Sequence, residues 1–161
     1  MKKHLLFLLL SIGIACHAQT FSTEHVNDSL YFLVLTTDST VDKWPLPYPV
    51  YRLCTGDVNG DGTEEAIVGV IKPTRFYPEK GRRLFIFKNY HGLVRPLWMG
   101  SKLGGTLQDF RFVGGKIRSL ESASNGLYVV AEYIWRYFGL SFERYLAKGV
   151  TRQQACVVFN S

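Results

Sequence analysis

Short runs of β-branched and aromatic residues, separated by glycine, asparagine and proline, constrain the fold of this 161-residue chain most strongly. Such runs are typical of strands, and glycine between two of them is typical of a hairpin turn. Three hairpins are expected, with turns at residues 89–92, 114–115 and 137–139. Beyond the N-terminal segment no stretch of ten residues shows a strong 3.6-residue periodicity, and residues 142–148 are only a marginal helical candidate. The sequence therefore predicts an all-β fold of antiparallel sheets and hairpins.

Individual strands are expected where these runs occur: residues 30–36, 66–71, 84–88, 93–98, 110–113, 116–120, 128–135, 140–146 and 156–159. Residues 43–49 contain three prolines, which lack a backbone donor, so this segment is expected to be a loop or an extended edge.

The first eighteen residues have the features of a secretory signal peptide: a basic start, a short apolar run and a small-residue cleavage region. Cleavage after Ala18 is favoured and leaves residues 19–161 as a single all-β domain. Lipidation of Cys16 is the alternative, although Gly13 stands where such motifs usually carry leucine. The protein is expected to be exported to the periplasm or cell envelope, or secreted, with membrane attachment only if Cys16 is lipidated.

Charge and cysteine content narrow the range of partners. The net charge of +6 comes from Lys and Arg residues that are scattered rather than grouped, so no nucleic-acid partner is expected. The four His residues are dispersed and offer no zinc-binding spacing. In an oxidising compartment Cys54 and Cys156 are compatible with a disulfide or with two buried thiols, and both alternatives stay open.

One loop carries the residue types and the spacing of a metal site. Side-chain oxygens recur at Asp57, Asn59 and Asp61, the backbone carbonyl of Thr63 follows, and Glu65 supplies a carboxylate at position 9. Ca²⁺ takes six to eight such oxygen ligands, and crowded carboxylates repel one another unless a cation neutralises them. A helical EF-hand is excluded because both flanks are strand-like. A polar turn is the alternative, but it does not need acids at alternate positions, so a structural Ca²⁺ site is favoured.

Residues 56–62, followed by an acid and the apolar strand 66–71, resemble the FG-GAP/VCBS repeat of integrin-α-like β-propellers. The resemblance implies that the loop joins two strands of a blade and binds Ca²⁺ through Asp57, Asn59, Asp61, Thr63 and Glu65. Residues 90–93 and 137–140 share the pattern Tyr-x-Gly-Leu. The two copies are 47 residues apart, a spacing typical of propeller blades. A closed propeller needs at least four blades of about 40 residues. The expectation is therefore about three incomplete or degenerate blade-like repeats, which form an open stack, close as a smaller sheet assembly, or are completed by a partner, self-association included.

Catalysis is not expected, because the chain has no Gly-x-Ser-x-Gly nucleophile motif and its His residues stand in linker or turn contexts. Glu121, Glu132 and Glu143 lie in strand-like surroundings. They are therefore interpreted as residues on the polar faces of strands rather than as the catalytic carboxylates of a glycosidase. The hairpin at residues 128–145 is rich in aromatic residues, which are expected in the core rather than as a platform for a sugar or protein partner.

These observations favour an exported, calcium-stabilised binding or scaffolding module with an unidentified protein or glycan partner. A lipid-anchored accessory subunit of an envelope complex and an exported glycan or peptide hydrolase are the alternatives.

Overall fold

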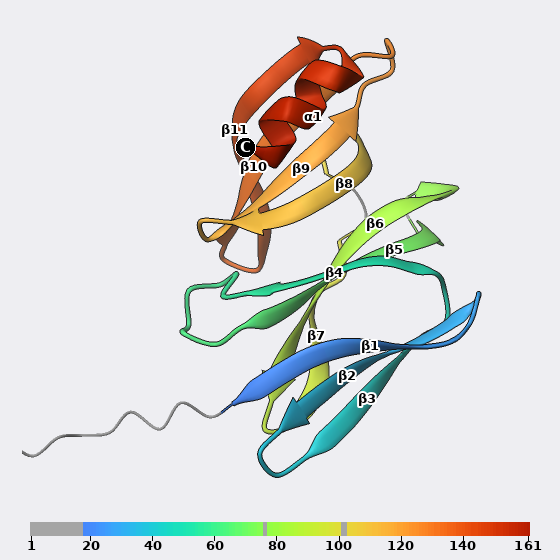
Figure 1. Ribbon diagram of the computed structural model, residues 1–161, viewed down its shortest axis with the longest axis vertical. Coiled ribbons are helices and arrows are strands. Elements are labelled where there is room, and N and C mark those ends of the chain that lie inside the picture. The colour runs from blue at the N-terminus through green and yellow to red at the C-terminus, as the bar shows by residue number, and fades with distance from the viewer. Residues whose placement is uncertain (1–17, 76, 101–102) are drawn as a thin grey trace, which may run out of the picture.

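The computed structural model describes residues 18–75, 77–100 and 103–161. Over these ranges the chain forms eleven strands and one helix, and the strands build three antiparallel sheets (Figure 1). The first sheet comprises β1 (Gln19–Asn27), β2 (Leu30–Thr37) and β3 (Val41–Leu46). The middle sheet comprises β4 (Val50–Gly56), β5 (Glu65–Thr74), β6 (Tyr77–Tyr90) and β7 (Leu93–Trp98). The third comprises β8 (Thr106–Val113), β9 (Lys116–Ser122), β10 (Tyr128–Arg136) and β11 (Gly139–Val150), and α1 (Arg152–Asn160) follows. The prediction of an all-β fold of antiparallel sheets is confirmed.

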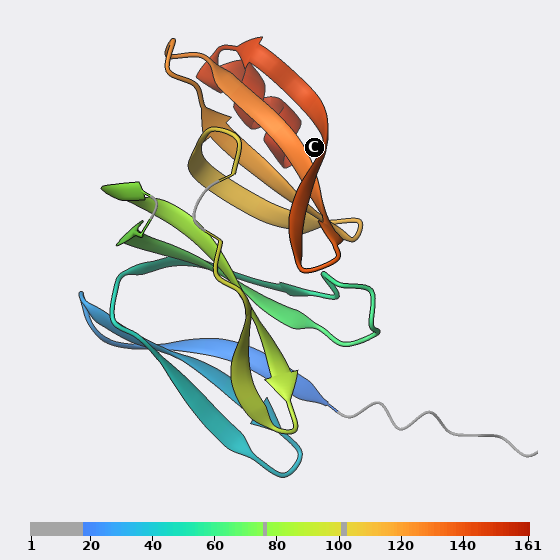
Figure 2. The same cartoon turned by 180° about the vertical axis from the view of Figure 1, so that it is seen from behind.

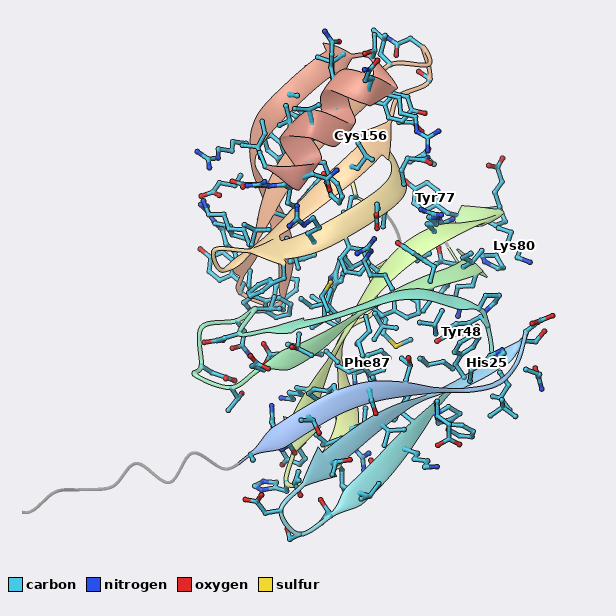
Figure 3. All side chains as sticks on the ribbon, in the orientation of Figure 1. His25, Tyr48, Tyr77, Lys80, Phe87 and Cys156 are labelled. Carbon is cyan, nitrogen blue, oxygen red and sulfur yellow. The ribbon has the colours of Figure 1, made fainter. Side chains whose placement is uncertain are left out.

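Every sheet is an up-and-down meander, and the three sheets lie one above another with α1 on the outer face of the third (Figures 1 and 2). One apolar cluster, including Leu33 and Phe87, fills the space between the first and middle sheets (Figure 3). A second, including Ile67 and Phe110, lies between the middle and third sheets. The middle sheet is thus covered on both faces. This is why β5 is a continuous apolar run rather than an alternating one.

The predicted hairpins are present. The β6–β7, β8–β9 and β10–β11 turns fall at the expected positions, and both Tyr-x-Gly-Leu copies lie at hairpin turns. Their backbones differ, however: His91 and Gly92 both have positive φ (53° and 81°), whereas in the second copy Tyr137 has positive φ (55°). Of the proline-rich segment, residues 43–46 lie in edge strand β3, where Pro45 is opposite Phe32, and residues 47–49 connect β3 to β4. An edge position tolerates the missing backbone donor.

The prediction of a strand at residues 156–159 is wrong, because they lie in α1. A capping box starts this helix: Thr151 N donates to Gln154 Oε1 (3.0 Å) and Gln154 N donates to Thr151 Oγ1 (3.4 Å). Ala155 and Phe159, four residues apart, are the buried side chains that seat it on the third sheet. The marginal helical candidate, residues 142–148, lies in β11.

Both Cys54 and Cys156 are free thiols. Cys54 packs against the cluster between the middle and third sheets, and Cys156 belongs to the cluster under α1 (Figure 3). The third sheet separates these clusters, so the structure favours the thiol alternative over a disulfide.

The expected signal peptide, residues 1–18, and the alternative lipidation site Cys16 lie outside the described residues, apart from Ala18. In the part of the chain that the structure describes, no helix is long and apolar enough to cross a membrane.

Candidate functional site

The acidic loop, residues 57–64, joins β4 to β5 at one edge of the middle sheet (Figure 1). Its backbone is anchored in the core, because Val58 is 5 % exposed and packs in the cluster between the middle and third sheets. At the end of β4, Gly56 lies directly against the Phe112 ring: a Cβ atom there would stand 2.0 Å from Phe112 Cε1. The loop is therefore held against the third sheet as well as within its own.

The Asp57 carboxylate organises the loop itself. Its Oδ1 accepts hydrogen bonds from Gly60 N (2.7 Å) and Asp61 N (3.1 Å), and its Oδ2 accepts one from Gly62 N (3.0 Å). Gly60 and Gly62 have φ of 79° and 87°, the left-handed region that favours glycine. Asp57 thus accepts the hydrogen bonds of three backbone amides within a tight turn.

Asn59 brings two of the predicted ligands together. Its Nδ2 donates to Asp61 Oδ2 (3.0 Å) and to Glu65 Oε1 (3.2 Å), so both carboxylates converge on one amide nitrogen. Thr63 contributes donors rather than a visible carbonyl contact, because its N and Oγ1 both donate to Asp61 Oδ1. These Thr63 bonds are the largest cause that lowers the pKa of Asp61.

Glu65 is the most buried acid of the set, with 1 % of its surface exposed. Its Oε2 accepts a hydrogen bond from Val58 N (2.9 Å). The pKa of Glu65 is raised to about 7, mainly by burial; the charges of Asp61 and Asp57 act in the same direction, and the Val58 hydrogen bond acts against them. This carboxylate is therefore costly to ionise in the structure as it stands.

Across the described ranges, no group of three or more His, Cys, Asp or Glu side chains is placed to hold a metal ion. Within this loop, both oxygens of Asp57 accept hydrogen bonds from backbone amides. Asp61 and Glu65 remain as the two carboxylates that converge, and Asn59 lies between them.

The other glutamates singled out from the sequence have distinct surroundings. Glu132 is 3 % exposed in its side chain and forms ion pairs with Arg118 (3.1 Å) and Arg144 (2.8 Å). Burial raises its pKa, but the hydrogen bonds of Arg144 and Arg118 outweigh that effect and lower it. Lys116 links Glu132 to Glu143, because its Nζ lies 3.8 Å from Glu132 Oε2 and 2.6 Å from Glu143 Oε2.

Glu121, in contrast, is held by neutral donors. Its Oε1 accepts hydrogen bonds from Ser119 Oγ (2.6 Å) and Tyr133 Oη (2.9 Å), and its Oε2 accepts one from Gly105 N. Alternation along β9 placed this residue on a strand face, but no sequence signal indicated a buried carboxylate. It lines a hollow of about 750 Å³ on the third sheet.

The expectation that the aromatic hairpin lies in the core is only partly correct. Tyr133 is buried, but Tyr137 and Phe138 at the hairpin tip are 94 % and 88 % exposed. Phe142 and Tyr145 are about half exposed and line the same hollow as Glu121. The turn position of Tyr137 and Phe138 was the signal for exposure, because hairpin tips lie on the surface.

No family model, curated protein or solved structure matches this chain.

Proposed function

We propose that this chain is an exported, calcium-stabilised β-repeat protein that acts as a binding or scaffolding module. The observation that carries the proposal is the buried Glu65 carboxylate, which shares one amide donor with Asp61 and has no cationic partner among the described residues. A buried carboxylate without a counter-charge is expensive, and a bound cation removes that cost.

The donor set fits Ca²⁺. Carboxylate, amide and carbonyl oxygens are the ligands this ion prefers. The Asn59 Nδ2 lies between Asp61 and Glu65, at a point that attracts positive charge. A half-turn of the Asn59 amide would direct its oxygen toward an ion held by these two carboxylates, with Asp57 and the Thr63 carbonyl as the remaining ligands.

The ion would have a structural role. Val58 and Gly56 pack against the third sheet at the start of the loop, and Glu65 opens β5 of the middle sheet. An ion that fixes the loop therefore stabilises the junction of the two sheets.

The FG-GAP/VCBS-like blade arrangement remains part of the proposal. Face-to-face stacking of meander sheets supports it, as does the position of the acidic loop between consecutive strands β4 and β5. Three sheets are fewer than a closed propeller needs, so a partner or a second copy would extend the stack.

Thermal unfolding of the chain in excess Ca²⁺, in excess Mg²⁺ and in EDTA tests the proposal. We expect Ca²⁺ at about 100 times its dissociation constant to add about 2.7 kcal/mol, a rise of several degrees in Tm. Asp61→Asn should abolish the rise, whereas Asp28→Asn, an exposed acid outside the loop, should keep it. Coincident melts in Ca²⁺ and EDTA would refute the proposal. Mass spectrometry of the mature N-terminus tests export separately, with Gln19 as the expected first residue.

A further inference from the structure

We infer that the hollow on the third sheet binds an organic cation through an alkylammonium group. The hollow has a volume of about 750 Å³, within the range of small-molecule sites, and its wall combines aromatic side chains with one buried carboxylate. The residues that carry the inference are Glu121, Tyr133, Phe142, Tyr145 and Lys148. None of them belongs to the acidic loop, so the inference goes beyond the proposed calcium-dependent role.

The carboxylate of Glu121 is buried without a counter-charge. Glu121 is 2 % exposed, and its three donors, Ser119 Oγ, Tyr133 Oη and Gly105 N, are all neutral. Within residues 18–75, 77–100 and 103–161, no Lys, Arg or His forms an ion pair with it. Glu132 on the neighbouring strand shows the contrast, because two arginines and Lys116 surround it. A ligand cation in the hollow would supply the charge that Glu121 lacks.

Three aromatic rings of the hollow contact one another in a row: Tyr133, Phe142 and Tyr145. Tyr133 and Phe142 meet edge to face with centroids 6.0 Å apart, and Phe142 and Tyr145 lie 4.6 Å apart. The faces of such rings attract cations, and clusters of them recognise quaternary ammonium groups. One ring already has a cation over it, because Lys148 Nζ lies 4.8 Å from the Tyr145 centroid. The chain's own ammonium group thus indicates the chemistry that the ring accepts.

Two glycines build the wall next to the carboxylate. Gly104 N donates to Tyr133 Oη (2.9 Å), and Gly105 N donates to Glu121. A Cβ at Gly105 would stand 2.9 Å from Glu121 Oε2, so only glycine allows this approach without displacing the carboxylate. The position of the negative charge is therefore fixed before any ligand arrives, which favours recognition.

A neutral sugar could stack on the same rings, but it would leave the charge of Glu121 uncompensated. Lys148 is the charged residue at the rim that competes with a ligand cation for the Tyr145 face. Charge therefore discriminates between the two ligand classes: Lys148 opposes the binding of a cation and has no charge effect on a neutral sugar.

The test is calorimetric titration of the full chain with choline and with its uncharged isostere 3,3-dimethyl-1-butanol. We expect choline to bind at least tenfold more tightly than the isostere. Glu121→Gln and Tyr145→Leu should each weaken choline binding about tenfold, Lys148→Ala should tighten it, and Tyr137→Leu at the exposed hairpin tip should leave it unchanged. If Glu121→Gln does not fold, the isostere comparison and the Lys148 variant still decide.

Equal binding of the two probes, no choline binding at millimolar concentration, or weaker choline binding by Lys148→Ala would overturn the inference. Oligosaccharide binding that depends on Tyr145 in place of choline binding would also overturn it. Vesicles of phosphatidylcholine, compared with free choline, distinguish a lipid headgroup from a soluble ligand. Choline binding that persists in EDTA separates this site from the calcium loop, so each proposal can fail without the other.

Discussion

The backbone amide of Val58 donates a 2.9 Å hydrogen bond to Oε2 of Glu65, which joins the start of the acidic loop to the first residue of β5. Both residues are buried, and the Val58 side chain packs between the middle and third sheets. Val58 therefore connects the carboxylate that is proposed to bind the ion with the core of the protein. Ion binding or a change of protonation at Glu65 should therefore change the free energy of unfolding of the whole chain.

Substitution of Glu65 separates the two roles of this residue. We expect Glu65→Gln to abolish the calcium-dependent rise in Tm, because the amide lacks the charge that the ion neutralises. In EDTA at pH 8 the variant should be at least as stable as the parent chain, because it removes a buried charge beside Asp61 and Asp57. Urea unfolding in both conditions measures this. A variant that keeps its full response to Ca²⁺ would exclude Glu65 as a ligand.

The ion-free protein should lose stability as the pH rises. The pKa of Glu65 in the folded chain is about 7, above its unfolded value near 4.5, so the folded state holds the proton more tightly. The resulting stabilisation is fully present below the unfolded pKa and is lost as the pH rises through about 7. From pH 5 to pH 8 in EDTA, the loss attributable to Glu65 should be about 2.5 kcal/mol. The comparison with Glu65→Gln isolates it, and identical pH profiles for the two chains would contradict the assignment.

Packing between the acidic loop and the third sheet can be tested at Gly56. A Cβ atom at this position would clash with the Phe112 ring, so Gly56→Ala should cost about 1–3 kcal/mol in urea unfolding. In a Phe112→Ala background the same change should cost less by about 1 kcal/mol or more, because the clash is removed. Additive costs would mean that the two residues are not in contact.

The ion pairs on the outer face of the third sheet should be unequal. Glu132 is 3 % exposed in its side chain and neutralises Arg118, whose side chain is 12 % exposed. Glu132→Gln should therefore cost about 3 kcal/mol, because it leaves the largely buried Arg118 without its counter-charge. The matched control is Glu143→Gln, where the acid is 30 % exposed and the cost should stay below about 1 kcal/mol. Similar costs for both would contradict the burial of the network.

Acid should weaken the same network. The pKa of Glu132 is lowered by its arginine partners despite burial, so its contribution is present above the unfolded pKa and is lost as the pH falls through the folded one. In acid the stability difference between the parent chain and Glu132→Gln should shrink. A constant difference across that pH range would argue against the lowered pKa.

Much of the fold could be predicted because strand signals are local. Apolar runs and turn glycines placed the β6–β7, β8–β9 and β10–β11 hairpins, and the prolines around Trp44 indicated a loop or an extended edge, of which residues 43–46 lie in edge strand β3. The C-terminal helix was missed because residues 156–159 are β-branched and aromatic. The Thr151–Gln154 capping box was the signal that outweighed them.

The candidate sites divide in the same way. The acidic loop could be found because its residues are close in sequence, and Asp57 and Glu65 are held in one turn. The hollow around Glu121 could not, because β7 of the middle sheet and β8, β9, β10 and β11 of the third sheet supply its wall, and only the packing of the two sheets brings them together. The direction of Asp57 toward backbone amides was equally invisible, since it depends on the conformation of Gly60 and Gly62.

Calcium binding can be measured by calorimetric titration of CaCl₂ into the EDTA-stripped and dialysed full chain at pH 7. We expect one saturable site, absent in Glu65→Gln, whose heat depends on the ionisation enthalpy of the buffer, because binding releases the proton that Glu65 holds with a pKa of about 7. A titration without saturable heat in two buffers of different ionisation enthalpy, on a chain that is folded by circular dichroism, would contradict this expectation.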